Sequence, residues 1–322
     1  MTGDGGLVCC SVGDRQYALR GGDVRQIVRV EKMRTLAGSD GSVGTLELAG
    51  QPVPVFRLGS VLGRTGGAQR NAPNSGGHHI AVTGEGSELV GWLVDRVVRT
   101  PLSQDAQIVA LPAVVGPAAT SWFEALVKVG GTSILLLAPQ SLNPLSPRQP
   151  RAGAIGSSAA PAVKKPGDSA EQIALLFSTP ALPRCAAPRF ALSGRQVAAI
   201  SQPMSPIPVP GSAAYVSGVA WWRNLVVPVI DFRGPGEHDD EAQRRRQLIA
   251  QCGSRLGNTL VAFAVDAEIA LHRPGTGDER AAGVPCPSFA AGVFDIGGEP
   301  VALLDLDSLL APVQRHVEGV PA

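Results

Sequence analysis

Short hydrophobic runs, broken every few positions by glycine, proline or polar residues, dominate the pattern of this chain of 322 residues. Such runs predict strands and turns rather than long helices. Apolar and polar positions alternate over residues 46–48, Ala49 and Gly50 supply turn residues, and residues 51–56 return, which predicts a β-hairpin. Other strands are expected at residues 15–19, 24–30, 88–98 and 134–137, with single helical turns near residues 60 and 308. The pattern favours small barrels or sandwiches.

The same series of patterns occurs twice along the chain. Tyr17-Ala18-Leu19 corresponds to Phe190-Ala191-Leu192, and Val94-Asp95 corresponds to Val265-Asp266. The hairpin at residues 44–56 corresponds to residues 218–230, and the Gly-Gly turn with its apolar run at 130–137 corresponds to 297–304. Ordered matches with small changes of spacing predict a duplicated domain.

A change of composition separates the two copies. Proline, alanine, glycine and serine dominate residues 146–170, where no apolar period is visible. Such a segment buries too little surface to offset the cost of ordering its backbone, so a flexible linker is predicted there. The expected organisation is a first domain at 1–145, a second at 171–315 and a tail at 316–322.

Charge and targeting signals narrow the class of protein. The formal net charge is +1 and only 17% of the residues are charged, which disfavours nucleic acid or an anionic membrane as partner. Neither a signal peptide nor an apolar run of membrane-spanning length is visible, so we expect a cytoplasmic protein without direct membrane insertion. The 5 scattered cysteines fit reduced thiols better than a disulfide framework.

Candidate chemistry is sparse. Asp95 and Asp266 recur without a recurrent partner, which predicts a turn-capping role rather than catalysis. His78-His79 and His238 are interpreted as strand and loop residues. Cys185, Cys252, Cys286 and His272 lack C-x-x-C spacing. Phosphate-loop, metalloprotease, nucleophile-elbow and kinase motifs were not found. The prediction is no enzyme, no catalytic residue, no metal and no cofactor.

Each half resembles the CheW-like domain of bacterial chemosensory systems. In the second copy the resemblance lies in residues 218–224, Pro228-Val229-Ile230-Asp231-Phe232, Val265-Asp266 and residues 303–306. In the first copy it lies in residues 17–19, Val24, residues 54–58 and residues 91–95. The resemblance implies an all-β fold with minor short helices, in which each domain consists of two SH3-like five-stranded β-barrels. It also implies two partners: the regulatory domain of a CheA-like histidine kinase and the cytoplasmic tip of a methyl-accepting chemoreceptor.

The chain departs from the family pattern at its contact positions. The hairpin arginine of the family is matched by Arg223 in the second copy and by Ala49 in the first. The glutamate that can pair with it is replaced by Gln26 and Ala199, so neither copy can form the pair. The resemblance gives these candidate partner-binding residues: Val24, Gln26, Val197, Gly218, Trp221, Arg223 and Asn224.

The adjacent tryptophans of the second hairpin must point to opposite faces of their strand. Trp222 corresponds to Leu48 and is expected to point inward, whereas Trp221 corresponds to Glu47 and is expected to point outward beside Arg223. An outward tryptophan next to an arginine has the composition of an interface hot spot. Cover of Trp221 by a loop or by the other barrel is the alternative, and it stays open.

Three functions follow as hypotheses. The first is a chemosensory adaptor that couples a CheA-type kinase to chemoreceptors or to a second array partner, in chemotaxis or type IV pilus motility, at membrane-associated arrays. The second is a localisation or polarity protein that recruits the array without activating the kinase. A hydrolase or small-ligand binder of unrelated kind is the disfavoured third.

Overall fold

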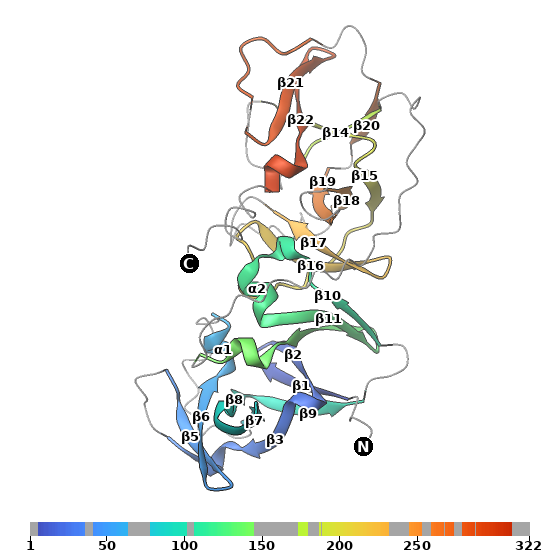
Figure 1. Ribbon diagram of the computed structural model, residues 1–322. Coiled ribbons are helices and arrows are strands. Elements are labelled where there is room, and N and C mark those ends of the chain that lie inside the picture. Colours follow the sequence, from blue (N-terminus) through green and yellow to red (C-terminus); the bar gives the residue numbers. More distant parts are fainter. Residues whose placement is uncertain are drawn as a thin grey trace. The chain divides into compact units, whose positions relative to one another are not determined.

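The computed structural model describes residues 6–35, 41–63, 78–101, 106–144, 173–179, 187, 189–231, 245–252, 259–266, 268–273, 279–286 and 288–310. The predicted linker at 146–170 and the tail at 316–322, like Cys185 and His238, lie outside these residues. The chain divides into two compact units, Met1–Leu111 with Ala118–Ala154, and Pro112–Pro117 with Ile155–Ala322. In Figure 1 the strands of the first copy run from blue to green and those of the second from yellow to red.

The first copy contains two six-stranded sheets, each curved into a barrel-like layer (Figure 1). We call the sheet that contains the predicted hairpin the hairpin barrel; its strand order is β3-β7-β8-β6-β5-β4. Its strands are β3 (Val24–Arg29), β4 (Met33–Arg34), β5 (Gly44–Leu48), β6 (Gln51–Arg57), β7 (His79–Thr83) and β8 (Val90–Val94).

The other sheet of the first copy, which we call the terminal barrel, has the order β10-β11-β12-β2-β1-β9. Its strands are β1 (Leu7–Val12), β2 (Arg15–Arg20), β9 (Arg96–Thr100), β10 (Gln107–Ala110), β11 (Phe123–Val129) and β12 (Thr132–Leu137). It therefore joins the first strands of the copy to its last ones, with β2 and β12 paired in parallel.

Short helices connect these strands. The α-helices are α1 (Leu58–Val61), α2 (Pro117–Trp122) and α3 (Pro139–Leu142). The 3-10 turns are η1 (Gly21–Asp23), η2 (Val30–Lys32), η3 (Gly86–Glu88) and η4 (Ala113–Val115). In the second copy, residues 306–310 are helical, as the sequence predicted near residue 308.

The second copy has two five-stranded sheets, which repeat the order of five of the six strands in each sheet of the first copy. Its hairpin barrel has the order β15-β18-β19-β17-β16, and its terminal barrel has the order β20-β13-β14-β22-β21. The strands are β13 (Ala174–Phe177), β14 (Arg189–Ser193), β15 (Val197–Ser201), β16 (Val216–Trp222), β17 (Leu225–Ile230), β18 (Arg246–Gln251), β19 (Leu260–Val265), β20 (Ile269–His272), β21 (Ala290–Ile296) and β22 (Glu299–Leu304). The predicted duplication and the all-β fold are confirmed.

The two strands that are extra in the first copy, β4 and β10, correspond to single β-bridges in the second copy. Where β4 pairs with β5, the second copy has the isolated bridge between Ile207 and Val219. Where β10 pairs with β11, it has the isolated bridge between Arg280 and Phe294. The five strands that both copies share in each barrel are thus the common fold.

The longer strand predicted for residues 88–98 is wrong, because the chain changes sheets inside it. Residue 88 ends the 3-10 turn η3, and the remainder is split at Asp95 into β8 and β9. Strand β8 belongs to the hairpin barrel and β9 to the terminal barrel. Apolar residues lie on both sides of Asp95, so the pattern alone does not show the change of sheet.

Each barrel has an apolar interior built by period-two alternation. In the hairpin barrel of the first copy, valine, leucine and isoleucine side chains form the core cluster: Val28, Leu46, Val53, Val55, Ile80, Val82 and Leu93. The second copy has smaller side chains in the matching cluster: Ala220, Val227, Val229, Ile249 and Ala262. The half-buried Trp222 packs against this second cluster, where the first copy has Leu48.

Candidate functional site

The tip of the β16–β17 hairpin is a two-residue turn made by Arg223 and Asn224. Trp222 pairs with Leu225 directly beneath it. Arg223 has φ 47° and Asn224 has φ 64°. Two positive φ values match the turn type whose twist suits paired strands, in which Asn-Gly is preferred. An arginine in the left-handed region costs about 1–2 kcal/mol, so strand pairing imposes an unfavourable conformation on Arg223.

The arginine of this turn covers a tryptophan. The Cζ atom of Arg223 lies 4.7 Å from the centroid of the Trp222 ring. A guanidinium over an indole face is attracted by the ring quadrupole, by about 0.5–1 kcal/mol at exposed sites. The stacking restricts the guanidinium at the tip of the hairpin while leaving its hydrogen-bond donors available.

The hairpin tip shares its core with the edge strand β15. Partly buried side chains from the hairpin tip, from β15 and the segment after it, and from β19 pack on the cluster of the second hairpin barrel: Ala198, Ala199, Met204, Trp222, Leu225 and Leu260. On β15, Ile200 is 41% exposed. We call the surface formed by Ala199, Met204, Trp222, Arg223 and Leu225 the hairpin platform. It combines a restrained cation with partly exposed apolar side chains, which is the composition of a protein contact surface.

The tryptophans differ from the sequence expectation in one respect. Trp222 points inward, as predicted, since it packs against the barrel core. Trp221 is half-buried and its indole nitrogen is buried, whereas Glu47 at the matching position is exposed. Arg223 stacks on Trp222 and not on its predicted neighbour Trp221. The tryptophan that presents the arginine is therefore Trp222, which the sequence reasoning had assigned to the core alone.

Gly218 lies at the other end of β16, beneath a crossing segment. A Cβ atom there would stand 2.4 Å from the carbonyl oxygen of Ile207. The matching Gly44 has the same constraint, with 2.6 Å to the carbonyl oxygen of Arg34. Both glycines allow a backbone segment to cross the start of the hairpin. Gly218 thus positions the hairpin, and its burial keeps it away from the platform surface.

Val24, Gln26 and Val197 lie around equivalent β-bulges. In β3 the register shifts between Val24 and Gln26, and in β15 it shifts between Val197 and Ala199. Val24 is buried, Val197 is half-buried and Gln26 is exposed. A bulge places an extra residue on the strand and re-aims its side chain.

The extra residue of the first bulge is a cation that the sequence reasoning missed. Arg25 forms an ion pair with Glu85 and donates from Nε to the carbonyl oxygen of Gly84 at 3.2 Å. The matching residue of the second copy is the uncharged Ala198. The bulge thus carries an arginine in the first copy only, and the hairpin tip carries one in the second copy only.

The recurrent aspartates lie where the chain passes from one barrel to the other. Asp95 Oδ2 accepts the backbone N–H of Gly13 at 2.7 Å, which confirms the predicted turn-capping role. The expectation that these acids lack a recurrent partner is wrong. His78 Nδ1 lies 3.3 Å from Asp95 Oδ1, and Arg245, at the position matching His78, forms an ion pair with Asp266.

Across the described ranges, His, Cys, Asp and Glu side chains form no group of three that could hold a metal ion. Cys9 and Cys286 are accessible thiols, whereas Cys10 and Cys252 are buried. In the part of the chain that the structure describes, no helix has the length and apolar character needed to span a membrane.

Two domains, each with a pair of barrel-like sheets and the same strand order, define a tandem two-barrel protein. Residues 6–144 and 182–314 match the family model of the CheW-like domain. These regions make up most of the chain, which therefore belongs to the CheW-like domain family. The resemblance seen in the sequence is thus confirmed.

A solved structure is also similar to one copy. The crystal structure of the scaffolding protein TtCheW from Thermoanaerobacter tengcongensis is 19% identical, with a TM-score of 0.37. The match covers 46% of this chain and 98% of that chain. No curated protein sequence matches this chain at the level of significance applied.

The family membership sets the function at a coarse level. CheW-like domains are adaptor domains of chemosensory systems, so the chain has a coupling or scaffolding role in chemotaxis signalling. Its partners are accordingly proteins of the chemosensory array in general.

Proposed function

We propose that this protein is a non-enzymatic adaptor that couples a CheA-type histidine kinase to chemoreceptors or to a second array partner, in chemotaxis or in type IV pilus motility. The hairpin platform of the second copy is the proposed contact with the regulatory domain of the kinase. The observation that carries the proposal is the stacking of Arg223 on Trp222 within a CheW-like domain.

The backbone of the platform supports a binding role. Arg223 occupies a left-handed turn position where glycine or asparagine would be more stable. Strain of this kind is often found at functional sites, where the surrounding structure enforces it. The stacked guanidinium offers several N–H donors beside apolar side chains, and it suits a partner surface with a carboxylate next to an apolar residue.

The presence of two copies supports coupling of two partners. The hairpin tip of the first copy has Ala49 and Gly50 instead of an arginine, and the exposed Glu47 next to it lies 3.7 Å from Arg34. The two hairpins thus differ in charge and shape, which favours different partners. The linker predicted from the sequence at 146–170 would make the two sites bivalent, with an effective concentration of order millimolar.

A localisation protein that recruits the array without activating the kinase is the second candidate. It is favoured by the absence of the glutamate–arginine pair in both copies, where Gln26 faces no hairpin arginine and Ala199 offers Arg223 no carboxylate. This candidate predicts binding to the array without kinase activation. Phosphorylation assays with receptor and kinase, with and without the protein, separate the two candidates.

Calorimetric titration of the full chain into the regulatory domain of the host's chemotaxis kinase tests the adaptor proposal. Micromolar binding is expected, and Arg223→Gln should weaken it about tenfold, the loss typical of a contact-surface arginine. Arg34→Gln is the matched control, since it removes an exposed arginine near the hairpin of the first copy. Equal affinity of the two variants would contradict the assignment of the platform, and the absence of binding by the wild-type chain would contradict kinase coupling.

A further inference from the structure

The terminal barrel of the first copy has an open cavity of about 260 Å³ at its surface, where Gln16, Arg96, Val98 and Thr132 are exposed. Its walls are side chains from five strands: Cys9, Ser11, Gln16, Arg96, Val98, Thr100, Val129, Thr132 and Ile134. The strand register explains their convergence, because Ser11 of β1 pairs with Gln16 of β2 on one side and with Arg96 of β9 on the other. The mouth of a small barrel is a common place for a ligand, and this volume suits a molecule of a few heavy atoms.

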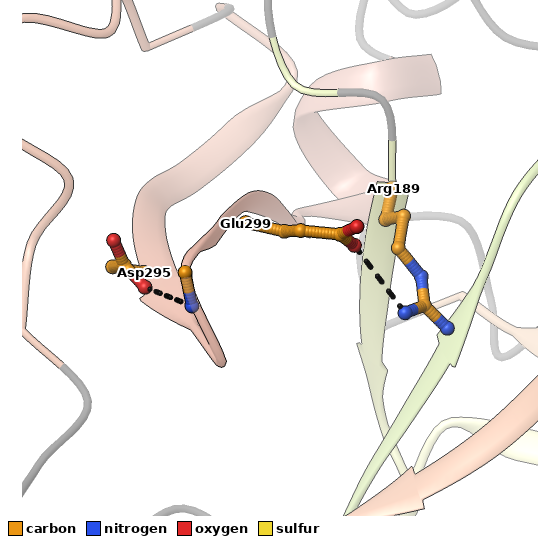
Figure 2. Close-up of polar contacts among 4 residues, drawn as sticks. Arg189, Asp295 and Glu299 are labelled. Carbon is orange, nitrogen blue, oxygen red and sulfur yellow. Dashed lines mark hydrogen bonds and ion pairs between the residues drawn. The ribbon is translucent and has the colours of Figure 1, made fainter.

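The matching barrel of the second copy has different side chains at three of these positions. The strand registers of the two copies can be matched residue by residue. Leu176 then corresponds to Cys9, Arg189 corresponds to Gln16, and Glu299 corresponds to Thr132. Leu176 belongs to the core cluster of that barrel. Arg189 Nη1 lies 3.5 Å from Glu299 Oε2, and Figure 2 shows the two side chains extended toward each other.

The β21–β22 turn beside this ion pair is also fixed by a side chain. Asp295 Oδ1 accepts the backbone N–H of Gly298 at 2.8 Å (Figure 2). In the first copy the residue matching Asp295 is Lys128. The second copy therefore has a leucine and an ion pair at the positions where the first copy has Cys9, Gln16 and Thr132.

The lining of the cavity indicates the chemical class of a ligand. Arg96 is its charged member, and in the described part of the chain the ion pairs do not involve Arg96. Hydroxyl and amide groups of Ser11, Gln16 and Thr132 add neutral hydrogen-bonding atoms, whereas Val98, Val129 and Ile134 form an apolar wall. A guanidinium binds a carboxylate through paired hydrogen bonds, and an apolar wall accepts a short hydrocarbon tail.

We propose that the terminal barrel of the first copy binds a small carboxylate with a short branched apolar tail, held by Arg96 and by the wall that includes Val98 and Ile134. This site lies apart from the hairpin platform and does not depend on the adaptor function. In the second copy Leu176, Arg189 and Glu299 take the places of Cys9, Gln16 and Thr132, so the proposed site belongs to the first copy.

A thiol in the cavity wall reports on occupancy. Cys9 is half-buried, and its Sγ atom lies 3.5 Å from Thr100 Oγ1. A molecule that fills the cavity blocks the approach of an alkylating reagent to Cys9. The exposed Cys286 lies outside the cavity and serves as an internal reference in the same chain.

The experiment is alkylation of the full chain by iodoacetamide at pH 8, with the rate at each cysteine followed by mass spectrometry. Sodium isovalerate is the probe, and sodium chloride of equal concentration is the salt control. For a ligand of seven heavy atoms a Kd of order 1 mM is reasonable, so about 10 mM isovalerate should slow alkylation of Cys9 about fivefold or more. The rate at Cys286 should not change.

Three comparisons make the result specific. Isovaleramide, the neutral isostere, should protect Cys9 at most weakly. Arg96→Gln should abolish protection, whereas Arg99→Gln, on the same strand but outside the cavity wall, should keep it. A double variant, Gln16→Arg with Thr132→Glu, copies the ion pair of the second copy and should abolish protection by closing the cavity.

Each variant is compared with and without isovalerate, so a change in the intrinsic reactivity of Cys9 does not affect the conclusion. Circular dichroism shows whether each variant is folded. Unchanged alkylation of wild-type Cys9, equal protection by isovaleramide, or retained protection in Arg96→Gln would overturn the proposal. Since no array partner is present, failure here leaves the adaptor function untouched.

Discussion

Asp95 Oδ1 lies 3.3 Å from His78 Nδ1, while the other carboxylate oxygen of Asp95 accepts the N–H of Gly13 at 2.7 Å. The carboxylate thus lies between His78, which directly precedes β7 of the hairpin barrel, and the β1–β2 turn of the terminal barrel. Backbone bonding reinforces the link, because the N–H of Asp95 donates to Ser11 O, as that of Asp266 does to Ser178 O. One aspartate therefore fixes the position of one barrel relative to the other within each copy.

Removal of this carboxylate should destabilise the first copy. A hydrogen bond to a charged acceptor is worth about 1.5–3 kcal/mol, and partial exposure of Asp95 reduces this to about 1 kcal/mol. Asp95→Ala should lower the free energy of unfolding by that amount, and Asp95→Asn, which keeps an acceptor for Gly13, should lower it less. Urea unfolding followed by the fluorescence of the buried Trp92 measures the change.

The matched control is Glu47→Ala. Glu47 is exposed and lies 3.7 Å from Arg34, so its removal should change the stability by about 0.5 kcal/mol or less. Equal losses for Asp95→Ala and Glu47→Ala would show that the carboxylate of Asp95 does not join the two barrels.

Arg223→Gly should separate folding from binding. Glycine relieves the left-handed strain of about 1 kcal/mol and loses a cation–π contact of similar size. The stability of the second copy should therefore change by less than about 0.5 kcal/mol, while binding to the proposed partner falls about tenfold. Thermal unfolding combined with calorimetric titration tests both halves of this prediction, and a large loss of stability would mean that Arg223 has a structural role.

Local sequence patterns predicted the individual strands and turns better than the arrangement of these strands in sheets. Ala49 and Gly50 supplied the turn signal, and the alternation on both sides gave the hairpin correctly, because these signals are local in sequence. The split at Asp95 was missed because the apolar residues on both sides of it predict a strand but not which sheet each part joins. The capping role of Asp95 followed from local chemistry, whereas its partner His78 is brought near only by the pairing of β7 with β8.

The candidate sites, too, depend on contacts that the local sequence does not fix. Inward packing of Trp222 followed from its match to Leu48. The stacking of Arg223 on Trp222 depends on the backbone of the turn, which residue types alone do not fix. The cavity of the first copy is lined by side chains from five strands, so no single motif in the sequence predicts it. Comparison of the two copies position by position, with Cys9 opposite Leu176, is the signal that a sequence reader could use.

Gly218→Ala should disrupt the second hairpin through a steric clash. A Cβ atom at this position would lie 2.4 Å from Ile207 O and 2.7 Å from the carbonyl carbon, both backbone atoms that cannot rotate away. Overpacking of this kind costs about 1–3 kcal/mol. Gly22→Ala is the control, because a Cβ atom at Gly22 meets nothing within 4 Å. Urea midpoints compare the two, and equal midpoints would show that the crossing segment adapts without cost.

The buried thiols should make the protein sensitive to alkaline pH. Burial raises the pKa of Cys10 to about 12, with a smaller contribution from the charge of Cys9, and burial followed by the charge of Asp307 raises the pKa of Cys252 to about 12. The pKa of an unperturbed thiol is 9.0 on the same scale. Both groups therefore bind their protons more tightly in the folded state.

Because the folded state holds these protons more tightly, the free energy of unfolding falls as pH rises. The stabilisation is fully present below about pH 9 and is lost as pH rises toward about 12, at up to roughly 1.4 kcal/mol per pH unit for each thiol. Urea unfolding between pH 8 and 10.5 should show this loss as a fall of the free energy of unfolding with pH. The slope of that fall should be smaller in Cys252→Ala than in the wild-type chain. It should be unchanged in Cys286→Ala, whose thiol is exposed. Identical slopes in all three proteins would mean that Cys252 is accessible to water in the folded state.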